Sequence, residues 1–130
     1  MKLLLDTHIF LWFISGDQRL PYSIQKHIRD RNNEVYLSVV SFWEVIVKYH
    51  LGKLPLPEPP ENYLPTQRER HQISELVLDE ASVSQLVRLP AIHRDPFDRM
   101  LICQAIRHSL TIATVDHAIQ AYTIPVLDYT

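Results

Sequence analysis

The feature that most constrains this chain is an alternation of short, fully apolar runs with longer segments whose apolar residues recur at helical spacing. Leu3-Leu4-Leu5 is apolar at successive positions, which suits a strand buried on both faces, here expected from Lys2 to Asp6. From Thr7 onward the spacing changes to that of an amphipathic helix. Because buried strands that alternate with helices are typical of parallel sheets, the sequence predicts an α/β fold with a mostly parallel sheet.

The same criteria place the remaining elements. Further strands are expected at Glu34 to Val40, Ser74 to Leu78 and Leu110 to Val115, with a candidate last strand at Pro125 to Leu127. Helices are expected at Thr7 to Ser15, Pro21 to Arg31, Ser41 to about Leu51, Thr66 to His71, Asp79 to Arg88, Asp95 to about His108 and Asp116 to Tyr122. The proline-rich segment Lys53 to Pro65 is interpreted as a stiff surface linker inside one domain that spans residues 1–130.

Composition narrows the class of protein. The chain has 130 residues, of which 46% are hydrophobic, enough for a globular core without disulfides. Cys103 is the single cysteine, which excludes an intramolecular disulfide and a cysteine-based zinc site. Glycine occurs only at Gly16 and Gly52, which excludes a glycine-rich phosphate loop. No apolar run approaches membrane-spanning length and no signal-peptide cleavage site follows the first strand, so we expect a cytoplasmic protein without a membrane partner.

Four acidic residues fall at equivalent places in this pattern. Asp6 ends the first strand, and Asp116 directly follows the strand at 110–115. Glu44 and Asp98 are expected in the first turns of their helices. Because helices that follow parallel strands begin at the carboxyl edge of the sheet, Asp6, Glu44 and Asp116 are expected on one rim, where ligands bind in open α/β folds. Asp98 joins them if its helix is wound in the same sense.

Each acid also has a purely structural interpretation. Asp6 and Asp116 are suitable helix N-caps, and Ser41 with Glu44 matches a capping box. Asp98 occupies the capping-box position three residues after the N-cap Asp95. Caps, however, need only one acid per helix and do not require the acids to converge.

Convergence of carboxylates indicates a metal site. Oxygen ligands are what Mg²⁺ and Mn²⁺ prefer, and such an ion activates water and shields the charge of a phosphodiester. Without a cation the carboxylates repel one another. The formal net charge of −2 is less basic than is usual for a nucleic-acid binder, although an acidic cluster lowers the total without preventing a basic rim.

The motifs around these acids resemble those of the PIN-domain nucleases, and most closely the VapC-type toxins of bacterial toxin–antitoxin pairs. The resemblance covers nearly the whole chain. It is carried by Leu3-Leu4-Leu5-Asp6-Thr7-His8, Val39-Val40-Ser41-Phe42-Trp43-Glu44, His93-Arg94-Asp95-Pro96-Phe97-Asp98-Arg99 and Thr114-Val115-Asp116. His8 departs from the family, in which many members have Asn or another small residue there.

The resemblance implies a three-layer sandwich with helices on both sides of the sheet, and a Mg²⁺- or Mn²⁺-dependent endoribonuclease that cleaves RNA. It also implies a homodimer and neutralisation by a cognate antitoxin, with the apolar helices at Ile9 to Ile14 and Phe42 to Tyr49 as candidate surfaces for these partners. Carried over by position, the catalytic and metal-binding residues are Asp6, Glu44, Asp98 and Asp116. Residues expected near the metal ligands or the substrate are Thr7, Thr114, Arg94 and Arg99.

Two other functional classes remain open. A phosphate-handling domain of the receiver or phosphatase type also gathers aspartates at strand ends. A receiver, however, would pair two adjacent acids near the first strand and carry a later Lys, whereas no Lys follows Lys53. The other class is a catalytically inactive interaction domain, against which the four intact acids argue. His8, His93 and His117 lie beside the motifs and are assigned no role, because a lone histidine is more often structural.

Overall fold

A computed structural model describes residues 1–129 and contains one four-stranded sheet. The strands are β1 (Lys2–Leu5), β2 (Glu34–Ser38), β3 (Ser74–Leu76) and β4 (Thr111–Ala113). Their order is β3-β2-β1-β4, and every pairing is parallel. The central strand is β1, in which Leu3 pairs with Val35 on one side and with Thr111 on the other. The predicted α/β class with a parallel sheet is therefore confirmed.

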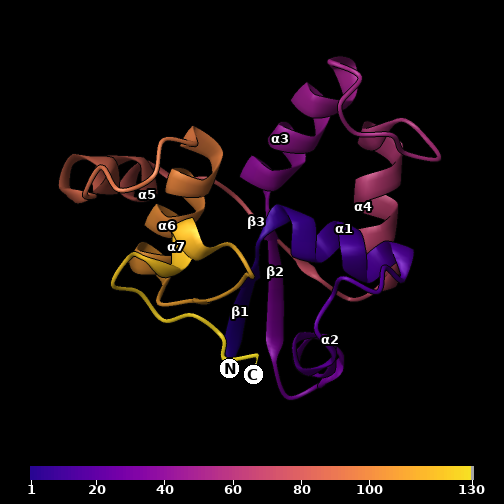
Figure 1. The fold of residues 1–130 in the computed structure, drawn as a ribbon, viewed down its shortest axis with the longest axis horizontal. Coiled ribbons are helices and arrows are strands. Elements are labelled where there is room, and N and C mark those ends of the chain that lie inside the picture. Colours follow the sequence, from indigo (N-terminus) through magenta and orange to yellow (C-terminus); the bar gives the residue numbers. More distant parts are fainter. Residues whose placement is uncertain (130) are drawn as a thin grey trace.

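Helices lie on both sides of this sheet (Figure 1). They are α1 (Thr7–Ser15), α2 (Tyr22–Arg29), α3 (Val39–His50), α4 (Pro60–Arg70), α5 (Glu80–Ser84), α6 (Pro96–His108) and α7 (His117–Gln120), with a 3₁₀ turn at Gln85–Arg88. Helices α1, α2 and α4 cover one face, α6 and α7 cover the other, and α5 packs against α6. None of these described helices is long and apolar enough to cross a membrane.

The side-chain alternation of β1 divides the core into two clusters. Leu3 and Leu5 pack with α1, α2 and α4, whereas Leu4 packs with α6 and α7. All three leucines are fully buried, and each contributes about 1.5–3 kcal/mol of transfer free energy. Helix α3 contacts α1 and α4 on one side and α6 on the other. Groups from both layers can therefore meet beside α3.

Local sequence explains where several helices end. Gly16 adopts a left-handed conformation, with φ of 66°, and its N–H binds carbonyls of the last turn of α1. Asp79 and Asp95 accept backbone N–H bonds as the N-caps of α5 and α6, as the sequence predicts. The predicted bounds of α1 and the predicted start of α6 are confirmed.

Other boundaries differ from the sequence prediction. Helix α3 begins at Val39 instead of Ser41, because Ser38 is its N-cap and accepts from the Val40 N–H. Helix α4 begins inside the segment interpreted as a linker: Pro60 occupies its first turn, where no N–H is needed. The helix expected to reach Arg88 changes to a 3₁₀ turn after Ser84. The candidate last strand is reduced to a single bridge between Val126 and Ile112.

Candidate metal centre

The carboxyl edge of the sheet holds the four predicted acids around one pocket of about 330 Å³. Asp6 directly follows β1, and Asp116 lies just beyond β4. Asp98 is in the first turn of α6, and Glu44 is in α3. The residues that line the pocket are Asp6, His8, Glu44, Lys48, His93, Asp95, Asp98, Val115 and Asp116. The convergence predicted from the sequence is therefore present.

Asp6 is held by a neighbouring strand end. Its side chain is buried, with the residue only 5% exposed, and Oδ2 accepts a 2.7 Å hydrogen bond from the Thr114 hydroxyl. Although Asp6 precedes α1, its side chain makes no capping hydrogen bond. Burial raises the pKa of this carboxyl above its ordinary value, and the charge of Glu44 adds to the rise. The simple capping interpretation of Asp6 is therefore wrong.

Glu44 is the most buried of the four acids, at 2% exposure. The Thr7 hydroxyl donates to Oε1 at 2.7 Å, and Lys48 Nζ donates to Oε2. Glu44 lies in the second turn of α3, not the first, so the capping box with Ser41 is wrong. The Ser41 hydroxyl instead lies 2.8 Å from the Thr7 hydroxyl. Burial is the largest single effect on Lys48 and disfavours its charge, but the hydrogen bond to Glu44 and the charges of Glu44, Asp95 and Asp98 together outweigh it and raise the pKa of Lys48.

The pKa of Asp98 is also raised in this pocket. Burial, followed by the charges of Asp6, Asp95 and Glu44, raises the pKa of Asp98 to about 7. Its carboxylate does not cap α6, since Asp95 does so and Asp98 Oδ2 instead contacts His93. A raised pKa of this origin is the expected result of carboxylates placed close together without a cation.

Asp116 lies at the open side of the pocket. Its side chain is 39% exposed, and one oxygen accepts the Ala118 N–H, so Asp116 does cap α7. The other oxygen lies 3.8 Å from His93 Nε2. Asp116 therefore caps α7, as its structural interpretation predicts, and also lies at the rim of the pocket.

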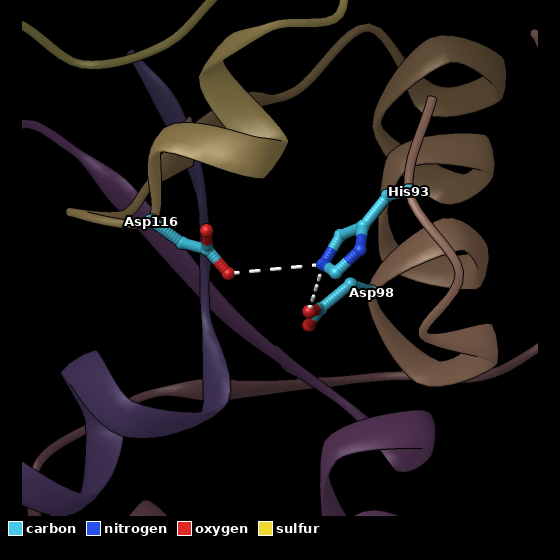
Figure 2. A group of neighbouring side chains, drawn as sticks. All are labelled: His93, Asp98 and Asp116. Atoms are coloured by element: carbon cyan, nitrogen blue, oxygen red, sulfur yellow. Dashed lines mark hydrogen bonds and ion pairs between the residues drawn. The ribbon is translucent and has the colours of Figure 1, made fainter. Parts of the chain in front are cut away.

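His8 and His93 line the pocket although the sequence assigned neither a role, and His93 contacts the acids directly. Figure 2 shows its ring between Asp98 and Asp116, with Nε2 2.9 Å from Asp98 Oδ2. It belongs to an irregular segment that precedes α6, where no periodicity indicates the direction of a side chain. The one sequence signal for His93 was its position five residues before Asp98 in the motif His93-Arg94-Asp95-Pro96-Phe97-Asp98-Arg99.

The two arginines predicted to contact substrate differ in their surroundings. Arg94 is exposed on the segment that carries His93. Arg99 Nη1 donates to the Pro90 carbonyl at 3.0 Å and to the Tyr122 hydroxyl at 3.3 Å. Part of the Arg99 guanidinium thus holds the segment before α6. A phosphate contact by either arginine stays a prediction.

The donor set fits a divalent cation with oxygen ligands. Among the residues that line the pocket, carboxylates greatly outnumber cationic side chains, and three of these carboxylates are almost inaccessible to water. Buried, mutually repelling carboxylates are compensated best by a bound cation, and Mg²⁺ or Mn²⁺ matches an all-carboxylate set. The residues present therefore fit such an ion.

The parallel sheet and the acidic pocket at its carboxyl edge define a broad class of α/β proteins. Comparison with known proteins identifies the family within this class. The sequence model of the PIN domain family matches residues 3–124, and the chain belongs to this family. It is similar to Ribonuclease VapC22 of Mycobacterium tuberculosis, with 24% identity over 94% of this chain and 92% of that protein.

Two further likenesses differ in extent. Ribonuclease VapC16 of M. tuberculosis is 43% identical over 54 residues, and the match spans only 42% of this chain and 38% of that protein. The crystal structure of VapBC2 from Rickettsia felis, bound to a DNA fragment from their promoter, superposes with a TM-score of 0.73. That match covers 98% of both chains at 16% identity, so it supports the fold.

Proposed function

We propose that this chain is a Mg²⁺- or Mn²⁺-dependent endoribonuclease and the toxin of a toxin–antitoxin pair. The observation that carries the proposal is the convergence of Asp6, Glu44, Asp98 and Asp116 on one pocket in a chain of the PIN family. Two relatives whose names describe them as ribonucleases support RNA as the substrate. In this proposal residues 1–130 form a single PIN domain.

The four acids would hold the cation, which supplies a water of lowered pKa and shields the charge on the phosphodiester. The chain itself fixes the ligands before substrate arrives. Thr114 orients Asp6, and Thr7 with Lys48 orients Glu44. Because each buried carboxylate is already hydrogen-bonded, little side-chain freedom is lost when the cation binds. Asp116, which is partly exposed, lies on the side from which RNA would enter.

The alternatives are weaker. Family membership and the absence of a Lys after Lys53 both argue against a receiver- or phosphatase-like domain. A catalytically inactive interaction domain has no need for three buried carboxylates, each of which costs free energy to desolvate. The intact set therefore favours an active enzyme.

The antitoxin would use an apolar hollow beside the active site. Trp12 and Ile14 of α1, Leu54 and Leu56 of the segment after α3, and Tyr63 of α4 line a hollow of about 330 Å³. His8 lines both this hollow and the acidic pocket, so the two are adjacent. One antitoxin segment placed here would bind apolar side chains and also reach the carboxylates with a basic side chain. The exposed Trp43 on α3 is a candidate contact for a second protomer in a homodimer. Such a toxin would act in the cytoplasm.

An RNA-cleavage assay tests the enzyme. With Mn²⁺ or Mg²⁺ the purified chain should cut single-stranded RNA, and EDTA should stop the reaction. Asp98→Asn should lower the rate about a thousandfold or more, since the charge stabilisation by a catalytic metal is worth several kcal/mol. Glu58→Gln, which removes an exposed carboxyl outside the pocket, is the matched control and should leave cleavage unchanged. Full activity in EDTA would contradict the metal mechanism.

A further inference from the structure

The ring of His93 is fixed at both of its nitrogen atoms. Nδ1 accepts the Arg94 backbone N–H at 3.0 Å, with the Asp95 N–H at 3.5 Å, while Nε2 faces Asp98 Oδ2 at 2.9 Å. In Figure 2 the same Nε2 atom also points toward Asp116. The ring therefore contacts backbone donors on one side and carboxylates on the other.

These contacts determine the tautomer. A ring nitrogen that accepts an N–H has no proton of its own, so the proton of the neutral imidazole lies on Nε2. A metal ligand must instead present a bare lone pair. Although the nearest atoms of His93, Asp98 and Asp116 lie within 4.8 Å of one another, as they would around a cation, Nε2 here is a hydrogen-bond donor.

The backbone of His93 is held by two residues from other elements. Its N–H donates to the Tyr122 hydroxyl at 2.9 Å, and Arg99 Nη1 lies 3.4 Å from its carbonyl oxygen. Arg99 also donates to Tyr122, which is buried beyond α7. The irregular segment before α6 is thus tied to the core at the residue that enters the pocket.

We propose that His93 is a positioning residue, whose Nε2–H holds Asp98 Oδ2 and leaves Oδ1 to bind the divalent cation. Arg99 and Tyr122 act through it by fixing its backbone. The inference rests on the proposed metal-dependent function and adds a residue to it. Partners that orient ligating carboxylates typically contribute about 10–100-fold to metal affinity or activity.

Calorimetric titration of the whole purified chain with Mn²⁺ and with Mg²⁺ tests the proposal without a cleavage assay. His93→Ala should lower the affinity for both cations by the same factor, about tenfold or more. His93→Gln should recover most of the affinity, because its amide also offers an N–H donor. An imidazole ligand would favour Mn²⁺ over Mg²⁺. A loss confined to Mn²⁺ would therefore make His93 a ligand and overturn the proposal, as would unchanged affinity for both.

Two further variants separate positioning from folding. Tyr122→Phe keeps the buried ring and should lower the affinity for both cations by a smaller factor. In the His93→Ala background the same substitution should have no additional effect on affinity. His50→Ala, at the exposed end of α3, is the matched histidine control and should leave affinity unchanged. If Asp98→Asn abolishes cation binding while His93→Ala does not alter it, only this inference fails. If the wild-type chain binds neither cation, the proposed function fails with it.

Discussion

At the scale of single residues, the pocket shows how one carboxylate changes its chemistry when it is buried beside others. Asp98 has an ordinary pKa of 3.8, which the fold raises to about 7, whereas Asp116 on the rim retains a large exposed fraction. The difference comes first from burial and then from the neighbouring charges of Asp6, Asp95 and Glu44. The metal-free pocket is therefore a source of strain that depends on pH.

The direction of this dependence follows from proton linkage. Between about pH 4 and pH 7 the folded chain keeps the Asp98 proton and the unfolded chain has lost it, so the folded state binds more protons. Stability from the protonated form is complete below pH 3.8 and is lost as pH rises through about 7. The rise of the Asp98 pKa from 3.8 to about 7 corresponds to a change of at most about 4 kcal/mol in the free energy of unfolding.

We expect the metal-free Asp98→Asn variant to melt at nearly the wild-type temperature at pH 3.5, below the unfolded-state pKa of 3.8, and several degrees above it at pH 8. The amide removes the charge that repels Asp6 and Glu44, and about 1 kcal/mol shifts the melting temperature of a chain this size by roughly 3–5 °C. Thermal melts in EDTA at both pH values measure the effect, with Glu58→Gln as the control. A lower melting temperature for Asp98→Asn at pH 8 would instead show that this carboxylate supports the fold.

At the scale of secondary structure, the sequence predicted best where a local signal marks a boundary. The bounds of α1 and the start of α6 were predictable, because Gly16 and the Asp95-Pro96 pair act through their own backbone conformation. Helix α4 was not, because Pro60 is compatible with a first turn and Pro65 lies inside the helix, where a proline ordinarily breaks it. The convergence of the acids followed from topology, whereas the direction of His93 depends on Tyr122 and Arg99, which no local pattern indicates.

The start of α3 gives a test at this scale. Ser38 accepts the Val40 N–H and donates to buried Gln104, whereas Ser41 contacts the Thr7 hydroxyl. Ser38→Ala should therefore lower the free energy of unfolding by about 2 kcal/mol, from a lost cap and an unpaired amide oxygen. Ser41→Ala should cost less, because Thr7 keeps its bond to Glu44. Urea denaturation of both variants measures the difference, and the reverse order would restore the capping box with Glu44.

At the scale of the whole molecule, the acidic pocket exists only when the sheet is complete. Asp6 and Asp116 follow neighbouring strands, β1 and β4, that are more than 100 residues apart in the chain. Glu44 and Asp98 reach the same place from α3 and α6, which contact each other above the sheet edge. Folding therefore brings mutually repelling charges together, and a cation that binds the folded chain alone should stabilise the whole domain.

A cell that makes the folded chain without an antitoxin should suffer from its activity. We expect inducible expression of the wild-type chain to arrest the growth of a bacterial host, and Asp6→Ala to remove the arrest while soluble protein accumulates to a similar level. The reason is that Asp6 lines the pocket but makes no capping bond, so its loss should affect cation binding more than folding. Glu58→Gln should arrest growth as the wild type does. Normal growth with abundant folded wild-type protein would contradict the toxin role, while RNA cleavage by the same purified protein would still identify a nuclease.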